Sequence, residues 1–206
     1  MGLIHIDLFT TLDGVAQAPG GPEEDTDGGF TFGGWQAPLI DEVVGEQVDS
    51  GMAGMDALLL GRRTYDIFAA YWPHEDGGIA RLFNRIPKYV ASRRPQALEW
   101  AGSTQLGADV ATAVRELRAR HANIHVIGSL DFVQTLFAER FFDRLTLGCT
   151  RSSSAVERRP SPTGQFRPIS GCSSRSSPRH RAWRCSATRS PTGRPASAIC
   201  RRSSRS

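Results

Sequence analysis

Apolar residues recur at every second position near the start of the chain and predict a β-strand. Ile4, Ile6 and Leu8 alternate with His, Asp and Phe, which is the two-residue period of a strand with one buried face. The pattern stops shortly before Asp13-Gly14, a pair that is typical of turns. The first strand therefore delivers Asp13 to its end.

Short apolar runs then alternate with amphipathic stretches, which predicts an α/β fold. The run of Ala and Leu at residues 57–60 lacks alternation, as expected for a strand buried on both faces. Further strands are predicted at residues 87–92, 124–127 and 145–147. Apolar residues three or four positions apart predict helices at residues 39–49, 109–120 and 130–139, and another that starts after Gly61. Residues 19–34 are rich in Gly and acidic residues and are predicted to form a long loop or functional flap.

The pattern ends after Leu147. Residues 148–206 contain 15 Ser and 13 Arg, few large apolar residues and no periodicity. So few apolar side chains cannot offset the conformational entropy lost on folding, so this segment is predicted to be disordered. We therefore expect one domain over residues 1–147 and an Arg/Ser-rich tail over residues 148–206.

Charge divides the chain at the same place. Residues 1–147 carry 12 basic and 20 acidic groups, whereas residues 148–206 carry 13 Arg and the single acidic residue Glu157. The overall net charge of +4 describes neither segment. Global charge is therefore no basis for predicting a nucleic-acid partner.

Cysteine spacing and hydropathy exclude two further classes. The four cysteines, all in the second segment, form no C-x-x-C pair, and the histidines show no metal-binding spacing, so no metal site is predicted. No apolar run approaches the roughly 18 to 20 residues of a membrane span, and no signal-peptide pattern is present. A cytoplasmic protein without a membrane partner is expected.

Candidate chemistry lies where predicted strands meet predicted helices. Gly61 is followed by Arg62, Arg63 and Thr64 at the start of a helix. Gly lets a ligand approach the backbone, free N–H groups point outward from a helix start, and guanidinium groups bind phosphate. The segment therefore predicts a phosphate cradle, and the alternative is an exposed helix cap with two solvated arginines.

Two other segments extend this pattern. Gly128-Ser129 also lies between a predicted strand and a helix, and two cradles suit a dinucleotide better than one. Ser92-Arg93 follows the third strand and offers a hydroxyl and a cation to a further phosphate, although a solvated basic loop is the alternative. Neither cradle has the G-x-G-x-x-G fingerprint of ordinary Rossmann domains. Trp35 is a candidate substrate-facing aromatic residue, with core packing as the alternative.

Five short segments carry a resemblance to a known family. They read TLDG, LLGRRTY, YWP, NxxPKYVASR and VIGS, at residues 11–14, 59–65, 71–73, 84–93 and 126–129. In this order and spacing they closely resemble the dihydrofolate-reductase-like family that includes the reductase domain of the bacterial riboflavin-biosynthesis deaminase-reductase. The resemblance covers residues 2 to about 147. It implies a mixed, largely parallel sheet flanked by helices.

The resemblance also implies an NADPH cofactor and assigns residues to it. In the family pattern, Asp13 and Gly14 line the nicotinamide and substrate pocket, and Ser92 and Arg93 face the adenosine 2′-phosphate. The remaining cofactor contacts fall to two groups, one for the phosphates and one for the pyrophosphate: Gly61, Arg62, Arg63 and Thr64; Ile127, Gly128 and Ser129.

The implied activity is hydride transfer from NADPH to a small heterocyclic substrate of the pteridine or pyrimidine kind. Asp13 is the candidate catalytic residue, because a carboxyl group at the pocket mouth can deliver a proton to the acceptor if burial raises its pKa. The alternative is that Asp13 only forms the Asp-Gly turn and bonds its own backbone. The expected partners are the small-molecule substrate and a second copy in a homodimer.

Other functions stay open because family members continue after Leu147 with strands that are not legible here. The composition of residues 148–206 is typical of a GC-rich gene read out of frame, so we expect a sheet that lacks its last strands. The chain could then be a nucleotide-binding module without turnover or an inactive family member. A tail that binds RNA is disfavoured, because it lacks interleaved aromatic residues and repeats.

Overall fold

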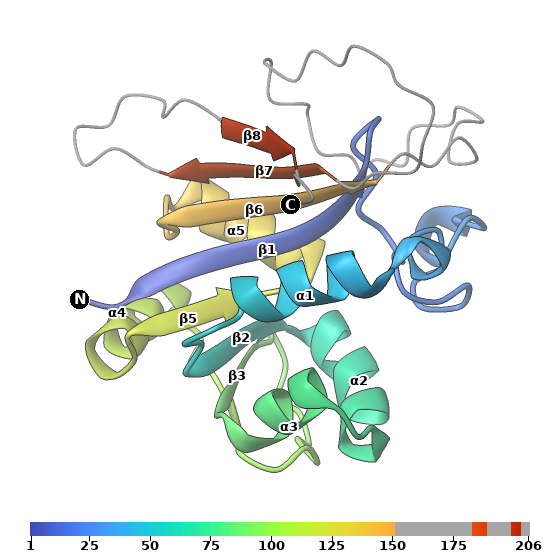
Figure 1. Ribbon diagram of the computed structural model, residues 1–206. Helices are drawn as coiled ribbons and strands as arrows, with labels where there is room; N and C mark the ends of the chain where they lie inside the picture. Colours follow the sequence, from blue (N-terminus) through green and yellow to red (C-terminus); the bar gives the residue numbers. More distant parts are fainter. Residues whose placement is uncertain (151–182, 189–198, 203–206) are drawn as a thin grey trace. The chain divides into compact units, whose positions relative to one another are not determined.

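The computed structural model describes residues 1–150, 183–188 and 199–202, and these form a mixed α/β structure (Figure 1). The chain divides into two compact units. The first unit consists of residues 1–7 and 46–144, and the second of residues 8–45 and 145–206. Three elements cross these boundaries: β1 (Leu3–Thr11), α1 (Glu42–Gly51) and β6 (Arg144–Thr150).

The first unit contains a parallel sheet. Its strands follow the order β4, β3, β2, β5 and β1, and every pairing between these neighbours is parallel. Strand β2 is buried at every position, as the continuous apolar run predicts. The strands not yet bounded are β2 (Ala57–Gly61), β3 (Lys88–Ala91), β4 (Ser103–Gln105) and β5 (Asn123–Val126).

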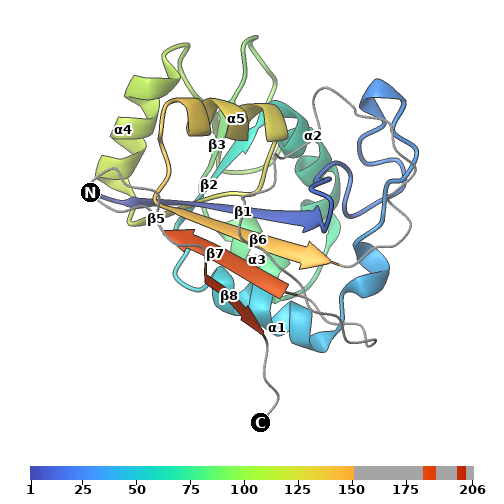
Figure 2. The ribbon, with the colours of Figure 1, turned by 90° about the horizontal axis from the view of Figure 1, so that it is seen from above.

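Helices cover both faces of this sheet. Helices α4 (Val110–Arg120) and α5 (Leu130–Ala138) lie on the same face of β5 in both views (Figure 1; Figure 2). On the other face, Leu58 and Leu60 of β2 belong to a core cluster with side chains of helices α2 (Arg62–Tyr71) and α3 (Gly78–Arg85). The first unit therefore has a core on each side of the strands.

One row of in-register residues crosses the sheet of the first unit. His5 pairs with His125, His125 with Leu58, Leu58 with Lys88, and Lys88 with Ser103. Neighbouring residues in a row project from the same face of a sheet. The row therefore places two histidines and a lysine on a face that is otherwise apolar around Leu58.

Lys88 is fully buried in this row. Its Nζ donates to the carbonyl oxygens of Asn84, at 3.0 Å, and Ala101, at 2.9 Å, and lies 4.4 Å from the centroid of the Trp100 ring. Burial lowers the pKa of Lys88 to about 8, while the carbonyls and the ring favour the charged form. The ammonium group thus ties the end of α3 and the segment before β4 to the start of β3.

The two histidines form a stacked pair in the same row. The rings of His5 and His125 are stacked, with centroids 4.5 Å apart and ring planes nearly parallel, at 7°. His125 Nδ1 is 2.7 Å from a carboxylate oxygen of Asp7, whereas Nε2 of His5 is buried without a hydrogen-bond partner among the described residues. Burial, followed by the neighbouring His125 and Arg144, lowers the pKa of His5 below its ordinary value of 6.5.

The second unit contains the end of β1, the segment from residue 12 to residue 41, and three further strands. The segment forms short 3-10 helices at Asp27–Gly29 and Ala37–Leu39. Strand β6 is followed by β7 (Trp183–Thr188) and β8 (Ile199–Arg202), which pair in antiparallel fashion.

These last two strands correct part of the expectation for residues 148–206. Neither strand is predicted from apolar periodicity, and the boundary expected after Leu147 falls inside β6. The rest of the predicted tail, residues 151–182, 189–198 and 203–206, lies outside the described residues. Residues 183–188 and 199–202 are therefore short strands within the segment for which the sequence predicts disorder.

The remaining predicted elements are confirmed with small shifts. The helix expected from residue 39 begins at Glu42, because Leu39 ends a 3-10 helix and Asp41 accepts the N–H of Val44 at 2.9 Å. Helix α3 and strand β4 were not predicted. Helix α3 is only eight residues long and begins at Gly78, directly after Gly77, without a side-chain cap, so no start signal marks it. Strand β4 is three polar residues long and carries no periodic signal.

Candidate functional site

Three parallel strands of the first unit end at one edge of its sheet. Gly61 at the end of β2 is in register with Ala91 at the end of β3, and β5 ends at Val126 next to β2. The segments that follow these strands therefore emerge at the same edge. They are the predicted cofactor segments, at residues 62–64, 92–93 and 127–129.

The neighbouring ends of β2 and β5 form a topological switch point. Helix α2 leaves β2 on the face of the sheet that carries Leu58 and Leu60, and α5 leaves β5 on the opposite face, where Phe132 lies against Gly61. In open α/β sheets, ligands bind outside the carboxyl ends of strands at such a point, because the departing helices separate there.

Two glycines bring the ends of these strands together. The N–H of Gly61 donates to the carbonyl oxygen of Gly128 at 2.9 Å. A Cβ atom at Gly61 would collide with Ser129 and Phe132, and one at Gly128 would collide with the side chain of Thr64. Gly61, Thr64, Gly128 and Ser129, which the sequence assigned to one cofactor site, are therefore in direct proximity.

The helices that start at this junction have no side-chain caps. The N-cap residues Gly61 of α2 and Ser129 of α5 make no capping hydrogen bond. In contrast, the first turns of α1 and α4 are capped by Asp41 and Asp109. Backbone N–H groups at an uncapped helix start, together with the helix dipole, favour an anion. The junction can therefore bind phosphate groups with two helix starts at once.

The two arginines of α2 are exposed. Arg62 Nε is 2.9 Å from an oxygen of Asp66, and both side chains are about half exposed, at 47% and 50%. An exposed ion pair of this kind contributes little to stability, so Arg62 can exchange its partner for a phosphate. Arg63 is exposed one residue further along the same turn. Ile127, in contrast, is half-buried against the core cluster.

Ser92 and Arg93 lie in a braced loop between β3 and β4. Ser92 Oγ donates to the carbonyl oxygen of Arg94 at 2.8 Å and accepts the Arg94 N–H at 3.3 Å. Gln105, the last residue of β4, contacts the loop at Arg94 and at Gln96. Arg93 itself is exposed. No sequence pattern pointed to Gln105, because it lies in β4, a short polar strand that was not predicted.

In the second unit, the turn that carries Asp13 is closed by other groups. The N–H of Gly14 donates to the carbonyl oxygen of Thr11 at 3.0 Å, and Thr11 Oγ1 accepts the N–H of Val15 at 2.9 Å. Gly14 adopts a positive φ of 88°. Asp13 is exposed, and the bonds that hold this turn come from Thr11.

Trp35 is in the core of the second unit. It is 8% exposed, and its Nε1 donates to the carbonyl oxygen of Gln17 at 2.8 Å. Gln17 in turn donates to the carbonyl oxygens of Asp25 and Asp27. These contacts hold the 12–41 segment together and favour the packing role of Trp35 over the substrate-facing role.

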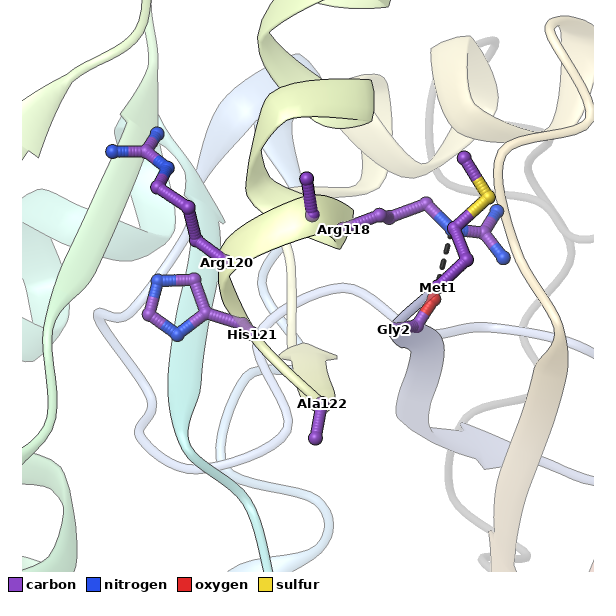
Figure 3. A pocket seen from close by; sticks show the side chains of 7 residues that line it. Met1, Gly2, Arg118, Arg120, His121 and Ala122 are labelled. Atoms are coloured by element: carbon purple, nitrogen blue, oxygen red, sulfur yellow. Dashed lines mark hydrogen bonds between the residues drawn. The ribbon is translucent and has the colours of Figure 1, made fainter.

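A shallow cavity of about 340 Å³ lies at the opposite edge of the first unit (Figure 3). Met1, Gly2 and residues 118–122 line it, next to the amino ends of β1 and β5. Arg118 is already engaged there, because its Nε donates to the carbonyl oxygen of Gly2 at 2.8 Å and its Nη2 pairs with Asp143. This cavity is therefore separate from the strand ends that carry the candidate site.

Two kinds of feature are absent from the described residues. Residues 1–150, 183–188 and 199–202 contain no group of three or more His, Cys, Asp or Glu side chains that could hold a metal ion. Over the same part of the chain, no helix combines the length and the apolar character needed to cross a membrane.

Residues 3–149 match the model of the RibD C-terminal domain family. The chain belongs to this family. The match covers both strand-end cradles and the Asp13 turn, and it confirms the predicted resemblance. It stops two residues beyond Leu147, where the periodic pattern also stops.

Solved structures show the same fold for this RibD C-terminal domain. A putative riboflavin biosynthesis protein from Shewanella sp. PV-4 is similar with a TM-score of 0.54 and 15% identity, over 73% of this chain and 77% of that one. Dihydrofolate reductase from Enterococcus faecalis, solved with NADP(H) and RAB-propyl, is similar with a TM-score of 0.50 and 12% identity, over 82% of this chain and 79% of that one. No curated protein is significantly similar to the chain. The predicted dihydrofolate-reductase-like fold is therefore confirmed.

Proposed function

We propose that this RibD C-terminal domain binds NADPH and reduces a small heterocyclic substrate of the pteridine or pyrimidine kind. The observation that carries the proposal is the pair of uncapped helix starts, α2 and α5, at the neighbouring ends of β2 and β5. Family membership and the NADP(H) complex of the Enterococcus faecalis enzyme support it.

The donor set at the junction fits a pyrophosphate. Backbone N–H groups at the starts of α2 and α5 point toward the same edge, and the close contact between Gly61 and Gly128 keeps the two starts adjacent. In the proposal, Gly61, Thr64, Gly128 and Ser129 hold the pyrophosphate, with Ile127 beside them. Arg62 and Arg63 neutralise its charge from the first turn of α2.

The 92–96 loop fits the additional phosphate of NADPH. Ser92 offers a hydroxyl group and Arg93 a guanidinium at the edge shared with Gly61, since Gly61 and Ala91 are in register. Each hydrogen bond to a charged phosphate contributes about 1.5 to 3 kcal/mol. Because NADH lacks this phosphate, the loop would select NADPH.

When bound, NADPH supplies the hydride for the reduction. Reduction of a C=N or C=O bond also needs a proton at the heteroatom, and in the proposal Asp13 delivers it, directly or through water. The exposed carboxyl group of Asp13 has access to solvent from which a proton can be replaced. Gly14 continues the turn with the positive φ that this backbone requires.

Titration of the 206-residue chain with NADPH and with NADH, followed by nicotinamide fluorescence, tests the cofactor assignment. We expect NADPH to bind at least about tenfold more tightly, because the 2′-phosphate adds charge-assisted hydrogen bonds. Equal affinities would remove the roles of Ser92 and Arg93. Consumption of NADPH in the presence of pteridine- and pyrimidine-like acceptors then tests the reductase activity.

A second candidate function is nucleotide binding without turnover. The exposed position of Asp13 favours it, because a general acid must be held within hydrogen-bond reach of the acceptor, and Asp13 projects from an exposed turn. Tight NADPH binding without consumption by any acceptor would support this candidate.

The proposal also includes a homodimer in the cytoplasm, as the family resemblance implies. Light scattering coupled to size-exclusion chromatography gives the mass in solution. A mass of one chain at all concentrations would contradict the dimer and would leave the cofactor assignment intact.

A further inference from the structure

We propose that Gln105 sets the selectivity of this chain for a 2′-phosphorylated adenosine, by relieving the Ser92 hydroxyl of its bond to Arg94. The inference rests on the proposed function, in which Ser92 and Arg93 bind the 2′-phosphate. Gln105 is the last residue of β4 and is in register with Val90 of β3. It therefore lies beside the loop that leaves β3, although it is 13 residues further along the chain than Ser92.

The side-chain amide of Gln105 holds the backbone of this loop at both ends. Oε1 accepts the N–H of Gln96 at 2.9 Å. Nε2 donates to the carbonyl oxygen of Arg94 at 2.9 Å and lies 3.5 Å from the carbonyl oxygen of Ser92. One side chain thus fixes the loop from its first residue to its last, and Arg93 is carried between the contacts.

The carbonyl oxygen of Arg94 is where these bonds converge. Besides Gln105 Nε2, it accepts the hydroxyl of Ser92 at 2.8 Å and is 3.4 Å from Nε2 of Gln96. A carbonyl oxygen has two lone pairs, so three donors compete for two positions. The Ser92 hydroxyl is therefore a replaceable donor, and its departure leaves the carbonyl satisfied by Gln105.

This arrangement gives Ser92 a second use. A hydroxyl group has one proton to donate. With a 2′-phosphate present, that proton turns to the phosphate, while Ser92 Oγ still accepts the N–H of Arg94 at 3.3 Å. Without the phosphate, the proton returns to Arg94. Gln105 thus contributes to binding only when the 2′-phosphate is present, which makes it a positioning residue for selectivity.

The test uses the full chain and two small probes, adenosine 2′,5′-bisphosphate and adenosine 5′-monophosphate, in calorimetric titrations. We expect Gln105→Met to weaken the bisphosphate about tenfold and the monophosphate less than about twofold, because only the former uses the loop. Thr104→Val, an exposed change on the same strand, is the matched control and should change neither affinity.

A double-mutant cycle separates this role from general loosening of the loop. If Gln105 acts through Ser92, the double variant Ser92→Ala/Gln105→Met should have an affinity for the bisphosphate within about threefold of that of Ser92→Ala alone. If the affinity losses of the two single variants instead multiply in the double variant, the inference is overturned. Gln105→Glu keeps the acceptor for the N–H of Gln96 and loses the donor to the carbonyl oxygen of Arg94, so it should also lose selectivity for the bisphosphate. This variant replaces Gln105→Met in the test if the Met variant does not fold.

The failures of the two proposals are distinguishable. A wild-type chain that binds both probes equally, or neither, contradicts the proposed function and the inference with it. A wild-type chain that prefers the bisphosphate, with the preference lost in Arg93→Ala and kept in both Gln105 variants, contradicts the inference alone.

Discussion

The two units hold their candidate functional residues in different ways. In the first unit, the backbone makes the site: the N–H of Gly61 bonds Gly128, and two helices start there without caps. In the second unit, Asp13 projects from a turn that Thr11 closes, and Trp35 packs under a loop. Backbone geometry restricts which residues can occupy a site, whereas a turn restricts them much less. The first kind of site is therefore easier to predict from sequence.

The largest expected effect concerns the second unit. Asp13→Asn should lower turnover about 100-fold or more, because general acid catalysis contributes about 10²–10⁴-fold and Asn has no proton to give. The thermal midpoint should stay unchanged, since Thr11 and the backbone close the turn. Stopped-flow or steady-state oxidation of NADPH measures the effect, with the exposed Glu23→Gln as the control. Full turnover in the Asn variant would leave Asp13 without a catalytic role.

Gly61→Val addresses the backbone site of the first unit. A Cβ atom at Gly61 lies 2.8 Å from Ser129 N and 2.9 Å from Phe132 Cβ, so the junction must open. Overpacking of this kind costs about 1 to 3 kcal/mol, and NADPH binding should be lost as well. Gly107→Ala enters open space and should affect neither. Chemical denaturation and fluorescence titration report both quantities, and unchanged NADPH affinity would separate the junction from the cofactor site.

Trp35→Phe tests whether Trp35 packs in the core of the second unit or contacts the substrate. The change leaves the carbonyl oxygen of Gln17 without its donor in a buried position, which costs about 1 to 3 kcal/mol. We expect a lower midpoint of unfolding and an unchanged KM for the acceptor. Phe32→Leu, at an exposed aromatic of the same segment, should leave the midpoint unchanged. A raised KM with unchanged stability would restore the substrate-facing role.

Arg62→Ala and Arg63→Ala test whether side chains add to the backbone site. Each should weaken NADPH about tenfold through lost charge-assisted hydrogen bonds, with little change in apo stability because exposed ion pairs contribute little. Asp66→Asn removes the ion-pair partner of Arg62 and leaves the charge of Arg62 in place. This variant should therefore bind NADPH at least as well as the wild type. Unchanged affinity in both Arg variants would indicate a solvated helix cap.

The smallest effect is a pH dependence of the first unit. Because the pKa of His5 is lowered below 6.5 by burial, and then by His125 and Arg144, the unfolded chain takes up a proton more readily than the folded one. The contribution of His5 to the free energy of unfolding is therefore fully present above about pH 6.5 and is lost as the pH falls through the lower pKa of the folded state. Thermal midpoints between neutral and mildly acidic pH should show this decline in the wild type and less of it in His5→Gln. Equal declines would assign the effect to other groups.

The outcome of prediction from sequence follows the strength of each local signal. The buried run of β2 and the heptad-like spacing of Val114 and Leu117 in α4 were sufficient to locate their elements. Strand β4 was missed because Ser103–Gln105 is short, polar and held by pairing with β3. Gln105 was missed with it, since its contacts to Arg94 and Gln96 depend on how strands pair and not on neighbours in the chain.

Strands β7 and β8 were missed for a related reason. In β7, Trp183, Cys185 and Ala187 do alternate with polar residues, but the run is six residues long and only the first of them is large. Strand β8 is four residues long and ends in two arginines, so neither run stands out from the Arg/Ser-rich composition around it. The antiparallel pairing of Cys185 with Cys200 joins residues 15 positions apart. Amino-acid composition indicates how much apolar surface a segment can bury. It does not indicate whether the backbone of that segment can pair with a neighbouring strand.

The in-register row from His5 to Ser103 limits where this domain can change in length. Side chains alternate between the two faces of a strand, so one residue inserted into β2 would turn Leu58 to the opposite face. The same insertion would move Gly61 away from Gly128, so folding and the cradle would fail together. Exposed Glu75 and Asp76, before α3, lie outside the row and can accommodate added residues. Insertions and deletions in homologous chains should therefore accumulate there and avoid residues 57–61.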